Sequence, residues 1–220
     1  MRVFIFFLLF LTIPDCYAQK QSIDSLQIYQ AVKGQLLTIN QDDQQGRQLL
    51  DSISRKYGAK SNQVDSLWKA IHVADQVNLE KIKVIFRQYG WIGEDKVGVQ
   101  ASMTQFLVIQ HSDVATQHQF LPIMRQAAKA KKADAGLLAM LEDRVALGER
   151  KMQIYGSQIS LDPNGAYVMP LVDPDNVDKR RAEVGLGPLA DYISRWHLKW
   201  DVNAYKAQLP ELKKKHGIDN

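Results

Sequence analysis

Apolar side chains recur every three or four residues along most of the chain, the spacing that gathers them on one face of an α-helix. This spacing predicts a first helix from Ile23 to about Asn40 and a short second helix that ends at Gly58. The polar run Gln41–Gly46 between them predicts a loop. Ser61 is a suitable N-cap for a third helix, and the helical spacing then continues to Tyr89.

The same pattern resumes after the segment Gly90–Gly93, which predicts a loop. A helix is expected over residues 97–111, and Ser112 or Asp113 can cap the next one, which continues to about Lys132. Asp134 is expected to cap a further helix that ends near Gly148.

The pattern changes to an alternation of apolar and polar residues after Lys151. Residues 152–161 and 166–171 alternate roughly with period two, and the turn sequence Asp162–Gly165 separates them. Short helices are expected after this pair of strands, over 176–184 and from Pro188. The sequence therefore predicts a mainly α fold (α+β), a helical body with one small antiparallel β-hairpin near residues 152–171.

The N-terminus has the layout of a secretory signal peptide. Arg2 precedes the apolar run Val3–Ile13, and the small residue Ala18 follows a polar stretch. The run is far shorter than the ~20 apolar residues that span a bilayer. We expect cleavage after Ala18 and a periplasmic or secreted protein without a transmembrane segment. A lipid anchor on Cys16 is the alternative, although lipoprotein leaders resemble one another in having Gly, Ala or Ser where this chain has Asp15.

The predicted organisation is a signal peptide (1–18), an N-terminal helical segment (19–58), a helical domain with the hairpin (59–200) and a basic C-terminal tail (201–220). A division into two domains near Gly58 is the alternative.

Composition removes several functional classes. The single Cys lies in the leader, so the mature chain has no thiol nucleophile, cysteine zinc site or iron–sulfur cluster. The net charge is +4, and the basic clusters at 127–133 and 213–215 are not interleaved with aromatic residues. We therefore expect no nucleic acid partner, and the partner is otherwise unknown. The sequence contains no phosphate-binding, dinucleotide-binding or zinc-protease motif, so we expect no cofactor.

Several short motifs between residues 75 and 192 resemble those of an uncharacterised bacterial family, a domain of unknown function. The motifs are Asp75-x-x-Asn78, Tyr89–Trp91, Gln110–Asp113, Leu141–Val145, Gln153–Gln158, Arg180–Leu186 and Tyr192. The resemblance covers just over half of the chain and implies no activity, because none is established for the family.

Two of these motifs contain residues suited to acid–base chemistry. His111 ends the apolar stripe of its helix, and Asp113 follows it closely enough to contact it across a tight turn. Arg144 lies on the buried stripe of a later helix and needs a carboxylate, for which Asp75, Asp113 and Asp143 are candidates, Asp143 the least favoured. The alternative is structural: a satisfied core histidine, a helix cap and an ion pair between helices.

The Gln153–Gln158 motif is expected on the first hairpin strand. Gly156 indicates a bulge or a close approach of the backbone, and a bulge would turn Tyr155 and Gln158 into one pocket. The alternative is that Tyr155 only packs against the helices. His111, Asp113, Arg144, Tyr155 and Gln158 form the predicted site. A metal site of His72, Asp75, His111 and Asp113 is less favoured, and no metal is predicted.

Two functions remain. The favoured hypothesis is a non-catalytic binding or structural envelope module with a buried polar cluster. The alternative is a small secreted hydrolase-like enzyme that uses His111 as acid or base, with Asp113 orienting it and Arg144 with Tyr155 or Gln158 stabilising an anionic group. A shared cleft of His111, Arg144 and Tyr155 would favour the enzyme, and internal hydrogen bonding of these residues would favour the module.

The leader yields the first testable prediction. Mass spectrometry of the exported protein is expected to find Gln19 as the N-terminal residue. An acylated Cys16 at the N-terminus, or an intact Met1 in a cytoplasmic fraction, would contradict the prediction.

Overall fold

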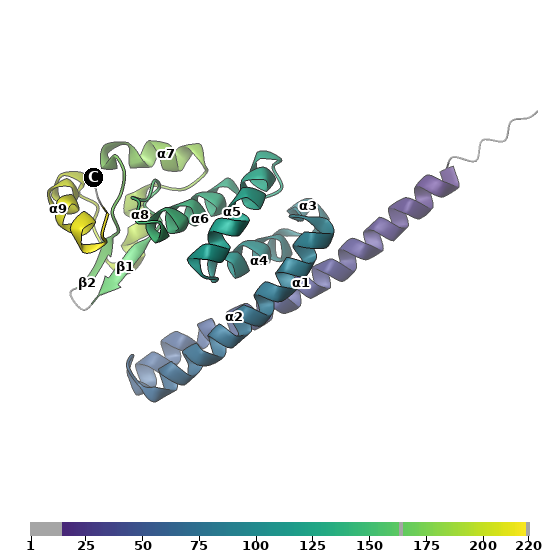
Figure 1. The fold of residues 1–220 in the computed structure, drawn as a ribbon, viewed down its shortest axis with the longest axis horizontal. Helices are drawn as coiled ribbons and strands as arrows, with labels where there is room; N and C mark the ends of the chain where they lie inside the picture. Colours follow the sequence, from purple (N-terminus) through teal and green to yellow (C-terminus); the bar gives the residue numbers. More distant parts are fainter. Residues whose placement is uncertain (1–14, 163–164, 219–220) are drawn as a thin grey trace, which may run out of the picture.

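The computed structural model describes residues 15–162 and 165–218, and it is mainly helical with one two-stranded antiparallel sheet in that range (Figure 1). The predicted fold class is therefore confirmed. Most of the predicted signal peptide, residues 1–14, lies outside the described residues. No helix in the described ranges is long and apolar enough to cross a membrane.

A long antiparallel helix pair, α1 (Asp15–Tyr57) and α2 (Asn62–Tyr89), opens the fold (Figure 1). The loop predicted at Gln41–Gly46 is wrong, because α1 continues through it. One polar residue there faces the interior, since Asp43 is 1% exposed, and a Cβ on Gly46 would lie 2.6 Å from Cγ1 of Ile71. Tertiary contacts with α2 thus keep helical a segment whose composition is typical of a loop.

Four helices follow, α3 (Glu94–Val97), α4 (Val99–Gln110), α5 (Val114–Lys129) and α6 (Ala135–Gly148). The helix expected over 97–111 is divided at Gly98, whose φ of +82° is accessible to glycine at little cost. The predicted N-caps are confirmed: Ser61, Asp113 and Asp134 each accept a backbone N–H from the first turn of their helices.

These first six helices enclose one hydrophobic core. Val32 and Leu36 of α1 are buried in the same cluster as Ile82 of α2 and Phe106 of α4. This shared core argues against the alternative of two domains divided near Gly58, because the buried residues described in α1 pack with those of α2 and α4.

The predicted hairpin is present but shorter than expected. Strands β1 (Ile159–Asp162) and β2 (Gly165–Val168) pair antiparallel, with Ile159 opposite Val168. The preceding residues are not a strand, apart from one isolated bridge between Gln153 and Leu171.

The chain ends in a second core. A 3₁₀ turn (Pro174–Asn176) leads into α7 (Val177–Glu183), α8 (Leu189–Ile193) follows with a second 3₁₀ turn (Ser194–Trp196), and α9 is the last helix (Val202–Lys215). The basic tail predicted at 201–220 is thus wrong over most of its length. Residues of α9 pack against the hairpin and α7–α8 in a cluster of buried apolar side chains: Val168, Leu171, Val177, Leu189, Ile193 and Tyr205.

The first core predicts that truncating a buried and an exposed leucine of α1 has very different effects on stability. Leu36→Ala is expected to lower the free energy of unfolding by about 2–5 kcal/mol, because Leu36 is fully buried and truncation leaves a cavity. Leu26→Ala is the matched control, since Leu26 is 61% exposed and its truncation should change stability by less than about 0.5 kcal/mol. Urea denaturation of both variants checks this, and equal losses would mean that α1 does not pack as described.

Candidate functional site

The structure separates the predicted site residues into two groups. His111 belongs to a cluster with Asp43, Arg47 and Asp75, called here the Asp43 cluster. Tyr155 and Gln158 belong to a loop organised by Asp143, and Arg144 is the next residue along the same helix. No hydrogen bond or ion pair between described residues connects these two groups.

His111 is held by a carboxylate that the sequence reasoning missed. It is the C-cap residue of α4, and its Nδ1 lies 2.9 Å from Oδ1 of Asp43. A carboxylate can only accept, so Nδ1 donates this hydrogen bond. Asp113, the partner expected from the sequence, is instead the exposed N-cap of α5, where it accepts from the N–H of Thr116 at 2.7 Å.

Arg47 connects the two carboxylates of the Asp43 cluster. Its Nη1 and Nη2 donate to the two oxygens of Asp75 at 2.9 and 3.0 Å, a bidentate pair between α1 and α2. Arg47 also lies one turn after Asp43 and donates to its backbone oxygen at 3.1 Å. The cluster therefore joins three helices, α1, α2 and α4, through charged groups.

The charges around Asp43 decide its protonation state. Burial raises the pKa of this carboxyl, but the hydrogen bond and charge of His111, the charge of Arg47 and the amide of Gln44 together bring the pKa below its ordinary value. Asp43 is therefore an anion at neutral pH although its side chain is fully buried.

The Asp43 cluster extends from this buried anion towards solvent. The side chains of Arg47 and His111 are each 18% exposed, and that of Asp75 is 11% exposed. One ligand atom from each of Asp43, Asp75 and His111 can be chosen so that all three lie within 4.8 Å of one another. Of the four residues in the metal site considered from the sequence, Asp75 and His111 are thus together. His72 also lies beside Asp75, with 3.9 Å between its Nδ1 and Oδ2 of Asp75, but its side chain is 69% exposed. Asp113 caps another helix.

A sequence signal for Asp43 existed. Val32, Leu36 and Ile39 define the buried stripe of α1, and the same spacing of three or four residues continues through Asp43 and Gly46. The polar composition of Gln41–Gly46 nevertheless favours a loop, and this composition conceals the continuing helical period.

The second group is centred on Asp143, which is fully buried on α6. Its Oδ1 accepts the N–H groups of Ile154 and Tyr155 at 2.6 and 2.9 Å, and its Oδ2 accepts that of Ser157 at 2.9 Å. Burial raises the pKa of Asp143, and these three donors oppose the rise. One carboxylate thus fixes the backbone of the loop 153–158.

The carbonyl groups of this loop are bound by residues from later in the chain. Arg180 donates to the oxygen of Ile154 at 2.9 Å, and Arg181 donates to that of Tyr155 at 2.8 Å. The hydroxyl of Tyr192 donates to the oxygen of Ser157 at 2.8 Å. The segments that contain these residues, from α6 to α8, are therefore tied to one loop.

Glutamine side chains complete the loop. The side chain of Gln153 accepts the N–H of Gln158 at 2.8 Å and donates to the carbonyl oxygen of Gln158 at 3.1 Å. The Gln153 amide thus makes the pair of hydrogen bonds that a residue of a neighbouring strand would make. Gln158 donates to the hydroxyl of Ser157 at 2.9 Å. Gly156 has a φ of +70°, and a Cβ there would lie 3.0 Å from Leu189. The close backbone approach expected at Gly156 is confirmed, whereas the strand expected for Tyr155 and Gln158 is wrong.

Arg144 does not form the ion pair expected of it. Its Nε is buried and has no hydrogen-bond partner among the described residues. Burial lowers the pKa of Arg144, and the nearby Tyr192 opposes that effect. Neither Asp75 nor Asp113 pairs with it, because Asp75 binds Arg47 and Asp113 caps α5.

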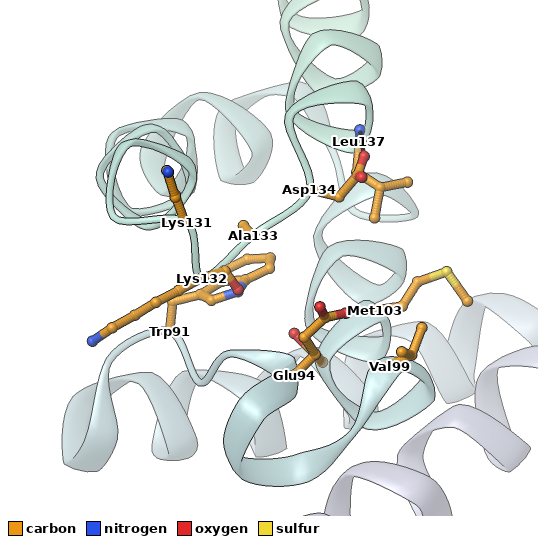
Figure 2. A pocket seen from close by; sticks show the side chains of 10 residues that line it. Trp91, Glu94, Val99, Met103, Lys131, Lys132, Ala133, Asp134 and Leu137 are labelled. Carbon is orange, nitrogen blue, oxygen red and sulfur yellow. Dashed lines mark hydrogen bonds between the residues drawn. The ribbon is translucent and has the colours of Figure 1, made fainter. Parts of the chain in front are cut away.

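A separate open pocket of about 330 Å³ lies between the start of α4 and the α5–α6 turn (Figure 2). Figure 2 shows the Trp91 ring beside Lys132 and Ala133, with Val99 and Met103 of α4 also lining the space. None of the predicted site residues lines this pocket.

The Asp143 group predicts a strong effect of a small change. Asp143→Asn should lower the free energy of unfolding by about 2–4 kcal/mol, because an amide nitrogen replaces an oxygen that accepts a buried N–H. Asp113→Asn makes the same substitution at an exposed N-cap, where Asn is as good as Asp, and should change stability by less than about 0.5 kcal/mol. Denaturant titrations of both variants check this, and a harmless Asp143→Asn would contradict the assigned role.

Comparison with known proteins places most of the chain in one family. No curated protein and no solved structure matches the chain. Residues 30–208 match the model of a family of unknown function, DUF6624. The match is wider than the segment 75–192 that the sequence motifs indicated, and it includes Asp43 and Arg47. The chain belongs to this family of unknown function, DUF6624.

Proposed function

We propose that this protein is an exported, non-catalytic binding module whose ligand site is the Asp43 cluster. The observation that carries the proposal is the convergence of two carboxylates, a guanidinium and an imidazole from three helices at a place that solvent reaches. The proposed export is supported by the leader-like sequence of residues 1–18, which precedes the family match.

The energetics of burial favour a binding role for the Asp43 cluster. Removing charges from water costs several kcal/mol per ion, and apolar residues of similar size often give equal or greater stability. A helix pair that needed only stability could therefore use apolar residues at these positions. Functional sites often retain groups that do not maximise stability.

The Asp143 group supports the proposal by contrast, because its polar residues have a structural role. Asp143 and the loop 153–158 satisfy one another with internal hydrogen bonds, as a structural cluster should. Tyr155 and Gln158 are thus parts of a fixed loop, and no hydrogen bond or ion pair in the described part of the chain links them to His111. This arrangement is the one expected of a module whose buried polar residues determine the fold.

A hydrolase-like enzyme is the second candidate, favoured by the geometry of His111. Its Nδ1 is held by Asp43, which leaves Nε2 as the nitrogen that can exchange a proton with a substrate. In such an enzyme, Asp43 would orient His111, the role that the sequence predicts for Asp113. Arg47 would bind the anionic group, the role that the sequence predicts for Arg144. Turnover of a substrate that is abolished by His111→Ala in a folded protein would favour this candidate.

The binding proposal is tested with five small probes of different charge: manganese chloride, zinc chloride, inorganic phosphate, succinate and putrescine. At least one should raise the Tm of the wild-type protein saturably, because a ligand that binds only the folded state stabilises it. At the same concentration, that probe should stabilise Asp75→Asn clearly less, because this change weakens the Asp43 cluster.

Asp175→Asn serves as the control, because Asp175 pairs with Lys206 at an exposed position near α9. It should respond to the probe as the wild type does. The proposal is overturned if no probe stabilises the wild type, or if Asp75→Asn is stabilised as much as the wild type.

A further inference from the structure

We infer that the ligand of the Asp43 cluster is a divalent first-row transition-metal cation, bound by Asp43, Asp75, His111 and the side-chain oxygen of Asn78. This inference rests on the proposed function and names the chemical class of its ligand. Two observations carry it, the grouping of the three ionisable side chains and the state of Asn78.

The spacing of the three ionisable ligands suits a small cation. Their ligand atoms lie within 4.8 Å of one another. Around a metal with bonds of about 2.1 Å, neighbouring and opposite ligand atoms are separated by about 3–4.2 Å. Small side-chain movements are therefore enough to bring the three ligand atoms into contact with one metal ion. An imidazole nitrogen with carboxylate oxygens is a donor set for cations such as Mn²⁺, Fe²⁺ and Zn²⁺.

Asn78 provides the independent observation. It is 1% exposed on the buried face of α2, and neither its side-chain oxygen nor its nitrogen has a hydrogen-bond partner among the described residues. An unsatisfied buried polar group costs about 1–3 kcal/mol, and such groups are uncommon in folded proteins. An apolar residue would fill this position at lower cost, so the amide indicates a ligand.

The helix geometry directs Asn78 towards the Asp43 cluster. Asn78 follows Asp75 by three residues, so both side chains project from the same side of α2. The ion pairs Arg47–Asp75 and Lys81–Asp42 fix the alignment of α1 with α2. Residue 78 lies between the two pairs on α2, as residue 43 does on α1. Asn78 is therefore level with Asp43 along the helix pair, on the buried side.

The remaining contacts are those of residues that orient metal ligands. Gln44 binds the Asp43 oxygen that does not face His111, and Arg47 can retain one oxygen of Asp75 while the other binds the cation. Two carboxylates and only one guanidinium meet in the Asp43 cluster, and this excess of anionic groups favours a cation. Binding would replace the hydrogen bond between His111 and Asp43 with bonds to one metal, because a ligating nitrogen must be deprotonated.

The test is isothermal titration calorimetry with MnCl₂ and ZnCl₂ on the full chain after removal of metals by EDTA and dialysis. The wild type should bind at least one of these cations with 1:1 stoichiometry. Asp75→Asn and His111→Ala, with folding checked by circular dichroism, should each weaken binding at least tenfold. Asp113→Asn is the control, because this carboxylate is near His111 in sequence but caps α5, and its affinity should stay within twofold.

The Asn78→Leu variant tests whether Asn78 is a metal ligand or only a structural residue. It should raise the denaturation midpoint of the metal-free protein, because it removes an unsatisfied buried amide, and should weaken metal binding about tenfold. A variant that binds metal as tightly as the wild type would remove Asn78 from the site and overturn the proposed ligand set.

The other outcomes distinguish this inference from the proposed function. If neither metal binds but phosphate, succinate or putrescine stabilises the wild type clearly more than Asp75→Asn, the metal inference is wrong and the binding proposal stands. If none of the probes acts, both are wrong. Metal binding that survives both Asp75→Asn and His111→Ala would place the metal elsewhere and overturn the inference.

Discussion

A buried carboxylate must find donors, and this constraint organises both parts of the protein. Asp43 and Asp143 are each almost completely inaccessible to solvent. An unpaired charge in such a place would cost several kcal/mol, so the surrounding chain has to supply hydrogen bonds or positive charge. The two residues meet this requirement differently, and the difference separates a structural cluster from the proposed site.

Asp143 is satisfied by backbone N–H groups, and the result is a rigid loop. Because its three donors come from the loop 153–158, the loop has to curve around the Asp143 carboxylate, with Gly156 in a positive-φ conformation. The loop carbonyls then bind Arg180, Arg181 and Tyr192. Most of the motifs noted after residue 140 thus serve one structural purpose, the attachment of the second core to α6.

Asp43 is satisfied by side chains, and these can exchange partners. His111 and Arg47 both extend to the surface and both end in groups that bind ions or protons. The motif Asp75-x-x-Asn78 and the motif around His111 meet at this point, which joins α1, α2 and α4. Side-chain donors make the Asp43 cluster adaptable, whereas the backbone donors of Asp143 cannot leave without unfolding the loop. This contrast is the physical basis for placing the ligand at Asp43.

Local patterns in the sequence determined the helices, the caps and the hairpin. Helical spacing depends on neighbouring residues only, and caps such as Asp113 and Asp134 act within one turn. The turn sequence Asp162–Gly165 likewise indicates the reversal between β1 and β2. The presence of His111 in a charged cluster could be anticipated for a similar reason, since it ends an apolar stripe.

Tertiary structure alone decided the partners of these residues. The choice of Asp43 over Asp113 for His111 depends on how α1 packs against α4, and residues 43 and 111 are too far apart in sequence for any local pattern to connect them. The same holds for the backbone groups bound by Asp143, which turn a segment with strand-like alternation into a loop. The sequence by itself therefore determined most of the helical segments and which residues carry charge, whereas packing kept Gln41–Gly46 helical. Long-range packing decided which charges meet, because the cost of burying each one depends on partners that only the folded chain brings near.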